Sequence, residues 1–461
     1  TSDSALGSSV IQRSLRFNND DNTRLSRTIG STSNRRTFTH SFWIKRTMKS
    51  AEQYVLYNGH SSGTPYFDAR FEANDHQFQF IDYTGSHAMQ LKTNRRFRDA
   101  SSWYHIVIAM DTTQGTASNR AKLYVNGVQE TSFATETYPS QNHDTGANVS
   151  GHLQVLGTLK AGTSNDLDGY LAEVHFIDGY QYDASYFGFT DPVTNIWSPK
   201  RYEGTYGTNG FYLDFSDNSS TAALGIDKSP NGNDFTANNF SVSAGTGNDS
   251  LEDTPTNNFC TLNAVNQDSN TTLTEGNLKA AGSSSTAYAN HTHGTIAKSS
   301  GKWYYEVEYT ANGGGTNSNL PAIGWARTSL RPSDNPTVSG GLCYRPAATD
   351  YIDLDGNDTS NDKPATTTGN VIQVAIDLDA GKIWFGNGGT YFESGNPSTG
   401  ANANLTFTGG AEELTPFVRS LSSTFNFNFG QRAFSYTPPT GFNKLSSSDS
   451  IPTSPSITKP Q

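Results

Sequence analysis

The sequence predicts an all-β protein made of two tandem antiparallel β-sandwiches joined by a bridging segment. Composition is the first indication: 33% of the residues are hydrophobic and 16% are charged, while aromatic residues reach 12% and glycines number 43. Such a composition suits short strands and tight turns. Aromatic runs with partial period-two alternation are separated by Gly, Asn and Asp turn signals, which favours strands over helices. At 461 residues the chain is also too long for one core, so more than one domain is expected.

The first sandwich is predicted over residues 14–195, after an N-terminal arm over residues 1–13. Its strongest signal is the stretch 103–130, in which two β-branched or aromatic runs form a hairpin that closes on Asn126-Gly127. Asn-Gly marks a type I′ turn because both central residues need a positive φ. Further strands are expected at 14–17, 38–45, 53–58, 66–72, 77–83, 152–157 and 168–179.

The second sandwich is predicted over residues 264–438. A bridging segment over 196–263, rich in Asn, Asp, Ser and Thr, precedes it, and an extended Pro- and Ser-rich tail over 439–461 follows. Its strands are expected at 301–309, 322–326, 369–379, 381–388, 414–418 and 425–430.

Ordered motifs in both halves resemble two known families. The opening LRFN, the hairpin WYHIVIAMD…KLYVNG and the closing strand DGYLAEVHFIDG resemble a laminin-G-like, concanavalin A-like jelly roll. The series GKWYYEVEY, AIGWA, GNVIQVAIDLD, GKIWFGNG and NFNFG resembles the SPRY (B30.2) sandwich, although Asn370 stands where that family usually has Asp and Gln373 where it has Gly. The first resemblance implies a domain that binds glycans or proteins more often than it catalyses a reaction.

The pairing of the two sandwiches is similar to structural proteins of tailed phages of marine bacteria. That resemblance implies a non-catalytic protein of the virion exterior, on capsid or tail: a tail-fibre, receptor-binding or capsid-decorating module that attaches to a host-surface glycan or protein. Its partners would be other virion proteins, and a fibre would imply a homotrimer, although the sequence has no coiled-coil heptads. Two alternatives stay open, a purely architectural capsid or tail component and a bacterial surface adhesin or glycan hydrolase.

Charge and hydropathy argue against two classes of partner. The formal net charge is −11 and no basic stripe is visible, so no nucleic-acid binding is expected. No apolar run reaches the roughly 18 residues that a membrane-spanning helix needs, so no membrane insertion is expected. The two cysteines, Cys260 and Cys343, do not make a disulfide framework and are expected as buried thiols.

A glycosidase is the main enzymatic rival. Its candidate carboxyl pair is Glu306 and Glu308, which strand alternation places on one face. A retaining mechanism needs two carboxyls about 5 Å apart, one of them with a raised pKa. The strand matches the SPRY pattern, in which these acidic positions are structural, so the sequence favours a protein without catalytic residues.

Metal ligands are suggested at two places, and no cofactor is otherwise indicated. His291 and His293 form a His-x-His pair whose imidazoles would point the same way in a strand. The pair resembles the motifs with which some phage-fibre trimers hold iron on their axis. The laminin-G-like resemblance implies one structural calcium, for which Asp144, Asp166 and Asp168 are the candidate ligands. The run 353–358 lacks the spacing and the distal Glu of an EF-hand loop.

Glycan binding is expected to use aromatic rings in loops, because the apolar face of a sugar stacks on a ring. Tyr344, Tyr351 and Tyr391 are near predicted loops of the second sandwich and are the candidates. The tryptophans inside predicted strands are expected in the cores: Trp43, Trp103, Trp303 and Trp384.

Overall fold

The computed structural model describes most of the chain as strands and connecting turns. The described residues are 9–47, 51–160, 162, 165–283, 291–311, 321–334, 340–346, 350–354, 357–363, 366–410 and 412–448; of residues 350–354 and 357–363 only Ile352 has a described side chain. The chain divides into two compact units: Thr1–Thr256 with Asn263–Asn266 and Leu273–Lys279, and Asn257–Leu262 with Gln267–Thr272 and Ala280–Gln461.

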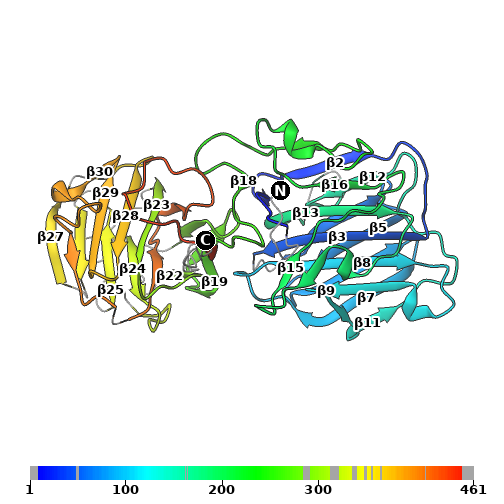
Figure 1. Cartoon of the computed structure of the whole chain (residues 1–461), viewed down its shortest axis with the longest axis horizontal. Coiled ribbons are helices and arrows are strands. Elements are labelled where there is room, and N and C mark those ends of the chain that lie inside the picture. Colours follow the sequence, from blue (N-terminus) through cyan, green and yellow to red (C-terminus); the bar gives the residue numbers. More distant parts are fainter. Residues whose placement is uncertain are drawn as a thin grey trace, which may run out of the picture. The chain divides into compact units, whose positions relative to one another are not determined.

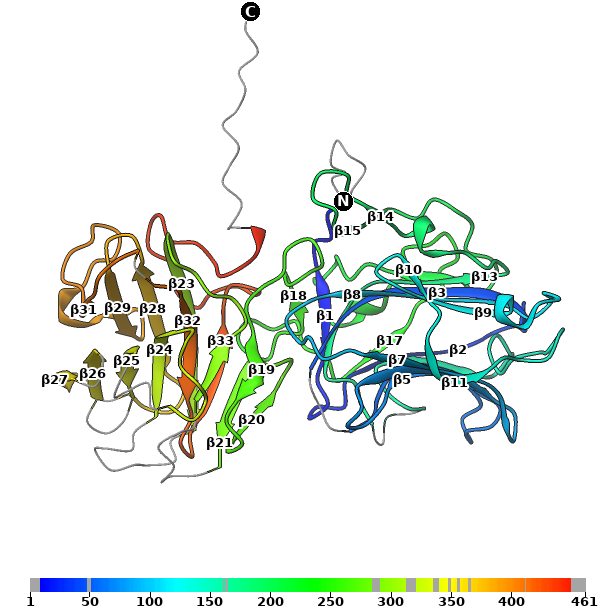
Figure 2. The same ribbon diagram turned by 90° about the horizontal axis from the view of Figure 1, so that it is seen from below.

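The first unit is a sandwich of two antiparallel eight-stranded sheets, which Figure 2 shows as separate layers. One sheet has the order β10 (Val128–Glu130), β9 (Ala121–Val125), β8 (Tyr104–Asp111), β3 (Thr37–Arg46), β13 (Gly169–Asp178), β1 (Ser14–Phe17) and β18 (Ser250–Leu251), with β16 (Phe211–Leu213) also paired to β13. The other has the order β11 (Phe133–Thr137), β7 (His87–Arg96), β6 (Gln77–Tyr83), β5 (Tyr66–Phe71), β4 (Gln53–Gly59), β12 (Leu153–Leu156), β2 (Arg24–Thr28) and β17 (Thr236–Asn238).

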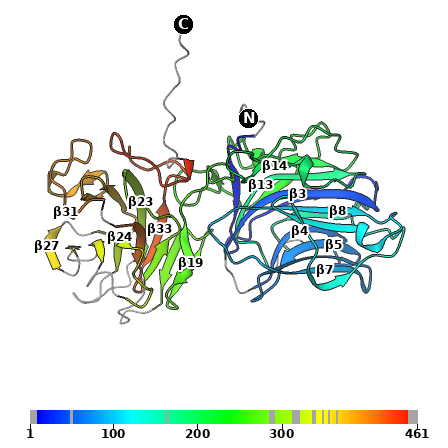
Figure 3. The same cartoon turned by 60° about the horizontal axis from the view of Figure 1, so that its bottom comes forward.

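Alternation along β3 explains how the two layers are held together. Phe38, Phe42 and Ile44 point into the sandwich and are buried, as the period of two requires. Phe38 meets Phe67 of β5 edge-on, with ring centroids 5.2 Å apart. Figure 3 shows β3 and β8 lying over β4, β5 and β7. The apolar core fills the space between these two layers.

The predicted hairpin is confirmed. β8 pairs with β9, and β9 turns into β10 through Asn126 and Gly127, whose φ values are 48° and 82°. A side chain at position 127 would collide with the Trp197 ring, because a Cβ built there lies 2.4 Å from it. Gly127 is therefore required both by the turn and by the close approach of Trp197.

The second unit holds most of two further antiparallel sheets. One has the order β19 (Leu262–Gln267), β22 (His291–Gly294), β32 (Leu414–Arg419), β24 (Ala322–Arg327), β25 (Gly341–Arg345), β26 (Asp350–Leu354) and β27 (Asn357–Lys363). The other has the order β20 (Thr271–Thr274), β21 (Lys279–Gly282), β33 (Thr424–Asn428), β23 (Lys302–Ala311), β28 (Val371–Asp377), β29 (Lys382–Asn387) and β30 (Thr390–Tyr391), with β31 (Leu405–Thr406) also on β29. β23, β28 and β29 are labelled in Figure 1.

The all-β prediction is confirmed: throughout the described residues the regular structure is strand and short 3₁₀ turn, without an α-helix. Those residues contain no helix long and apolar enough to cross a membrane. Both cysteines are buried thiols, as expected. The segment predicted as a bridge supplies β16, β17 and β18 to the sheets of the first unit.

Candidate functional site

An aromatic layer covers part of the outer face of the β8–β3–β13 sheet in the first unit. The segment after β13 crosses this face, passing through the 3₁₀ turn η2 (Ala184–Tyr186) and the two-stranded sheet of β14 (Gly188–Thr190) and β15 (Trp197–Pro199). Its side chains pack on the outward residues of the sheet. The layer comprises Val107, Ile177, Ala184, Phe187, Tyr202 and Tyr206, with Tyr124, Tyr182, Trp197 and Tyr212 at its edges.

A β-bulge in β13 places a carboxyl group under this layer. The pairing of β13 with β3 shifts register between Ala172 and His175, and Glu173 adopts a left-handed φ of 49°. Leu171 and Val174 both point into the core in spite of their odd spacing, because the bulge inserts one residue between them. Glu173 and His175 therefore share the outer face. A left-handed glutamate is uncommon, and such residues cluster at functional sites.

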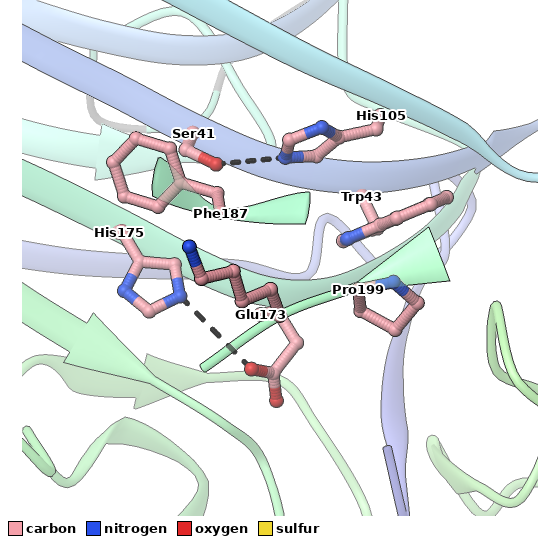
Figure 4. Close-up of a pocket in the computed structure, with 8 residues that line it drawn as sticks. Ser41, Trp43, His105, Glu173, His175, Phe187 and Pro199 are labelled. Carbon is pink, nitrogen blue, oxygen red and sulfur yellow. Dashed lines mark hydrogen bonds and ion pairs between the residues drawn. The ribbon is translucent and has the colours of Figure 1, made fainter. Parts of the chain in front are cut away.

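Figure 4 shows the small pocket that these groups line. Ser41 and Trp43 come from β3, His105 from β8, and Glu173 and His175 from β13. Phe187, Pro199 and Lys200, from the segment after β13, complete the lining. The pocket thus gathers a hydroxyl, two imidazoles, a carboxyl and an ammonium group on one sheet face.

The Ser41–His105 pair is not a nucleophile with its base. The Trp197 indole N–H donates to His105 Nδ1 over 3.0 Å, and an indole nitrogen can only donate. Nδ1 is therefore the acceptor, and Nε2 carries the proton that it shares with Ser41 Oγ at 2.9 Å. Burial also lowers the pKa of His105 to about 3. The imidazole has no free lone pair with which to take the serine proton.

Glu173 and His175 are equally engaged. The Tyr212 hydroxyl donates to Glu173 Oε2 over 2.7 Å, and His175 Nε2 lies 4.0 Å from the same oxygen. His175 Nδ1 is 3.1 Å from the Tyr206 hydroxyl, and its ring stacks on Tyr212 with centroids 4.3 Å apart. Burial raises the pKa of Glu173 to about 7 and lowers that of His175 to about 3. The imidazole is therefore neutral, and this pocket offers a single carboxyl where a glycosidase needs two.

Glu173→Gln is expected to remove a pH dependence of stability. Because burial raises the folded-state pKa from 4.5 to about 7, the folded protein keeps a proton that the unfolded chain releases between these values. Wild-type stability should therefore fall as the pH rises through this window, by about 2 kcal/mol relative to the variant. Urea unfolding of both proteins at about pH 4.5 and about pH 8 measures this difference. Stabilities that change with pH in parallel in the two proteins would contradict the prediction. The change would then come from groups that both proteins share, such as the buried histidines.

The exposed end of the aromatic layer is a stack of three tyrosines. The rings of Tyr180 and Tyr182 lie 5.4 Å apart and 3° from parallel, and Tyr182 and Tyr186 lie 4.0 Å apart at 27°. Tyr180 is 43% exposed and Tyr186 45% exposed. In the same layer Tyr202 and Tyr206 are buried. Sequence reasoning missed this stack and the bulged Glu173, although the run YQYDASYF at 180–187 was a visible signal for the stack.

Glu306, the main candidate acid of the rival hydrolase, has a structural role in the second unit. Its buried carboxylate accepts the Tyr304 hydroxyl at 2.8 Å and the backbone N–H groups of Ser435 and Tyr436 at 2.7 and 2.9 Å. It therefore ties the segment after β33 to β23. Glu308 lies further along the strand and is half-buried.

Of the three predicted glycan-binding tyrosines, the two with described side chains, Tyr344 and Tyr391, are not exposed rings. Tyr344 is fully buried: its ring packs against Phe385 and Phe392, and its hydroxyl lies 2.5 Å from Thr366 Oγ1. That prediction is wrong, because β25 presents this side chain to the interior. Tyr391 is half-buried against the cluster around Trp384. Tyr351 lies in β26, and its side chain is outside the described residues.

The predicted His-x-His pair lies in β22 and is buried. The two rings are 5.0 Å apart at 44°. Burial lowers the pKa of His291 to about 3 and that of His293 to about 4, so both imidazoles are neutral. Among the described side chains, no set of three His, Cys, Asp or Glu residues comes together that could hold a metal.

The three predicted calcium ligands have separate partners, and the described structure does not bring them together. Asp144 is exposed and pairs with Arg36 Nε at 2.7 Å. Asp166 accepts the Thr158 hydroxyl. Asp168 is buried and accepts the Gly276 N–H at 3.0 Å within the same unit. Each carboxylate is thus engaged with a protein group instead of facing a shared site.

Comparison with known proteins identifies the class of both domains. Residues 17–180 match the Laminin_G_3 family model, the concanavalin A-like lectin/glucanases superfamily, and residues 302–432 match the SPRY domain model. The chain therefore carries a concanavalin A-like domain followed by a SPRY domain, in the predicted order. Domains of both kinds are typically non-catalytic binding modules. No curated protein matches the chain.

Three solved structures are similar to single domains of this chain. The TRIM65 PSpry domain is 14% identical with a TM-score of 0.28, covering 37% of this chain and 92% of its own. The native heptameric SAP-like pentraxin from Limulus polyphemus is 15% identical with a TM-score of 0.28, covering 38% and 79%. The SPRY domain of human HERC1 is 18% identical with a TM-score of 0.24, covering 32% and 87%.

Proposed function

We propose that this protein is a non-catalytic attachment protein on the exterior of a phage particle, where it binds a host-surface glycan or protein. The observation that carries the proposal is the outer face of the first domain. Its serine, histidines and carboxyl are engaged with one another and with aromatic partners, while the tyrosine rings at the edge of the layer stay exposed. This arrangement favours ligand binding by the exposed rings over catalysis, because the polar groups are not arranged for proton transfer.

The phage context is supported by the tandem arrangement of the two domain types, which is similar to structural proteins of tailed phages. On a particle, the partners would be other virion proteins. Repetition of a weakly binding domain over the particle surface would raise its avidity by about 10² to 10⁴. Weak individual contacts are therefore enough for attachment.

Binding of the full chain to an array of bacterial envelope polysaccharides, with calcium and again with EDTA, tests the attachment role. We expect saturable binding to a narrow set of glycans, and loss in EDTA would place a metal in the site. An antibody against the chain should label the particle surface in electron micrographs. A folded chain that binds nothing on the array, with labelled particles, would favour the architectural role. Unlabelled particles would contradict the virion location.

An architectural contact is the second candidate, favoured by an exposed aliphatic pair. Val193 is 77% exposed and Ile196 63% exposed in the turn between β14 and β15. Two exposed aliphatic side chains in one turn suit a protein neighbour. If this turn docks on the particle, the variant Val193→Ser/Ile196→Ser should be incorporated into particles less efficiently than the wild type, as measured by mass spectrometry of purified virions.

A further inference from the structure

We propose that Tyr180, Tyr182 and Tyr186, the tyrosine stack, form a platform that binds a neutral glycan. This inference rests on the proposed attachment function and deepens it, because it names the surface and the chemical class of the ligand. No predicted site residue belongs to this stack.

The backbone of the stack is anchored to the sheet below. Thr39 Oγ1 donates to the Tyr180 carbonyl at 2.8 Å and accepts the Tyr182 N–H at 2.9 Å. The Gln181 amide donates to the carbonyls of Ala109 and Asn119 at 3.3 and 2.9 Å. These bonds fix the backbone that carries the two rings before any ligand arrives, so binding would lose little backbone entropy.

The turn η2 brings the third ring into the stack. Asp183 caps this turn, and its Oδ1 accepts the Ser185 N–H at 2.8 Å and the Ser185 hydroxyl at 2.6 Å. The short 3₁₀ turn then places Tyr186 over Tyr182. Because Tyr182 stacks on both other rings, the faces open to a ligand are those of the two exposed end rings, Tyr180 and Tyr186. A flat aromatic face of this kind matches the apolar C–H face of a pyranose.

Exposure distinguishes the stack from ordinary packing. Tyr202 and Tyr206, from the same layer, are only 6% and 8% exposed. Tyr180 and Tyr186 keep nearly half of their surface in water, whereas Tyr182, which stacks on both, also contacts the buried Tyr202 ring with centroids 5.9 Å apart. Large aromatic side chains that stay exposed and prearranged are typical anchors of a binding surface.

Polar groups beside the stack favour a glycan without net charge. Asp183, Ser185 and Lys200 are exposed, and Lys200 Nζ donates to the Ser185 carbonyl at 3.2 Å. One carboxylate and one ammonium group balance each other, and together with the tyrosine hydroxyls they supply both donors and acceptors for sugar hydroxyls. A polyanionic glycan would instead call for a concentration of positive charge.

The test uses the full chain on an array of neutral polysaccharides (dextran, mannan and galactan) beside uronic-acid- and sulfate-bearing ones. We expect binding to a neutral glycan, and at least a tenfold loss of affinity in Tyr180→Ala/Tyr186→Ala. Tyr186→Phe keeps the ring and should retain most of the binding. Val128→Ser changes another exposed side chain of the first unit without removing a ring and should bind like the wild type.

A second measurement does not depend on the folding of any variant. Nitration of the wild type by tetranitromethane, mapped by mass spectrometry, should modify Tyr180 and Tyr186, and a bound neutral glycan should protect both. Tyr138, which directly follows β11 in the other sheet of the same unit, should react equally with and without glycan.

Three results would overturn the inference. If the wild type binds a glycan but the double alanine variant binds equally and nitration is unprotected, the platform lies elsewhere and the attachment function stands. If the wild type binds only the charged glycans, the ligand class is wrong. If the wild type binds no glycan, and Val193→Ser/Ile196→Ser is incorporated into particles less efficiently than the wild type, both the inference and glycan attachment fail.

Discussion

Asp253→Ala is expected to lower the free energy of unfolding of the first unit by about 3–5 kcal/mol, the cost of removing one partner from a buried ion pair. Lys45 Nζ lies 2.8 Å from Asp253 Oδ2, and both side chains are almost completely buried. The Trp103 indole also donates to Asp253 Oδ1 over 3.1 Å. The substitution leaves an ammonium and an indole N–H in the interior without this carboxylate. Urea unfolding followed by tryptophan fluorescence measures the loss.

The matched control removes both charges. Lys45→Met/Asp253→Leu fills similar volume without burying an uncompensated charge, and replacement of a buried pair by apolar residues is often close to neutral. We therefore expect the double variant to lie much nearer to the wild type than Asp253→Ala does. Equal destabilisation by both variants would show that packing at this position, and not the buried charge, causes the effect.

Glu306→Ala is expected to destabilise the second unit by about 3 kcal/mol and to loosen the segment after β33. The change removes an acceptor from two backbone N–H groups and from the buried Tyr304 hydroxyl, and hydrogen bonds to a charged group are worth more than neutral ones. Hydrogen exchange at residues 434–437 should accelerate in the variant. Chemical denaturation gives the size of the loss.

Glu308→Ala provides the comparison for this second prediction. Glu308 lies two residues along the same strand but is half-buried, so its replacement should cost less than about 1 kcal/mol. A larger effect at Glu308 than at Glu306 would contradict the structural role assigned to Glu306. Neither variant should change glycan binding by the tyrosine stack, because that surface belongs to the first unit.

Much of the fold could be predicted from local sequence. The hairpin of β8, β9 and β10 follows from a β-branched run and an Asn-Gly turn, and both turn residues have the expected positive φ. The two domain types follow from short motifs in a fixed order, which the family models match. These features are local because strand alternation and turn chemistry depend on neighbouring residues alone.

The site was harder to predict, because what covers a sheet face comes from distant parts of the chain. Tyr344 carried the signature of a loop aromatic, yet it is buried against Phe385 and Phe392. Glu173 looked like one more residue of an apolar strand. Only the register shift in β13 turns its side chain to the outer face, and no local motif marks that bulge.

The sequence by itself determined that this chain is all-β, with a concanavalin A-like domain before a SPRY domain. Only the tertiary structure decided which polar residues are engaged and which rings remain exposed. Asp253 meets Lys45 across more than two hundred residues of sequence, and Trp197 sets the tautomer of His105 from a segment that crosses the sheet. The physical reason is that strand periodicity fixes the two faces of each strand, whereas burial and hydrogen-bond partners depend on which other segment packs on each face.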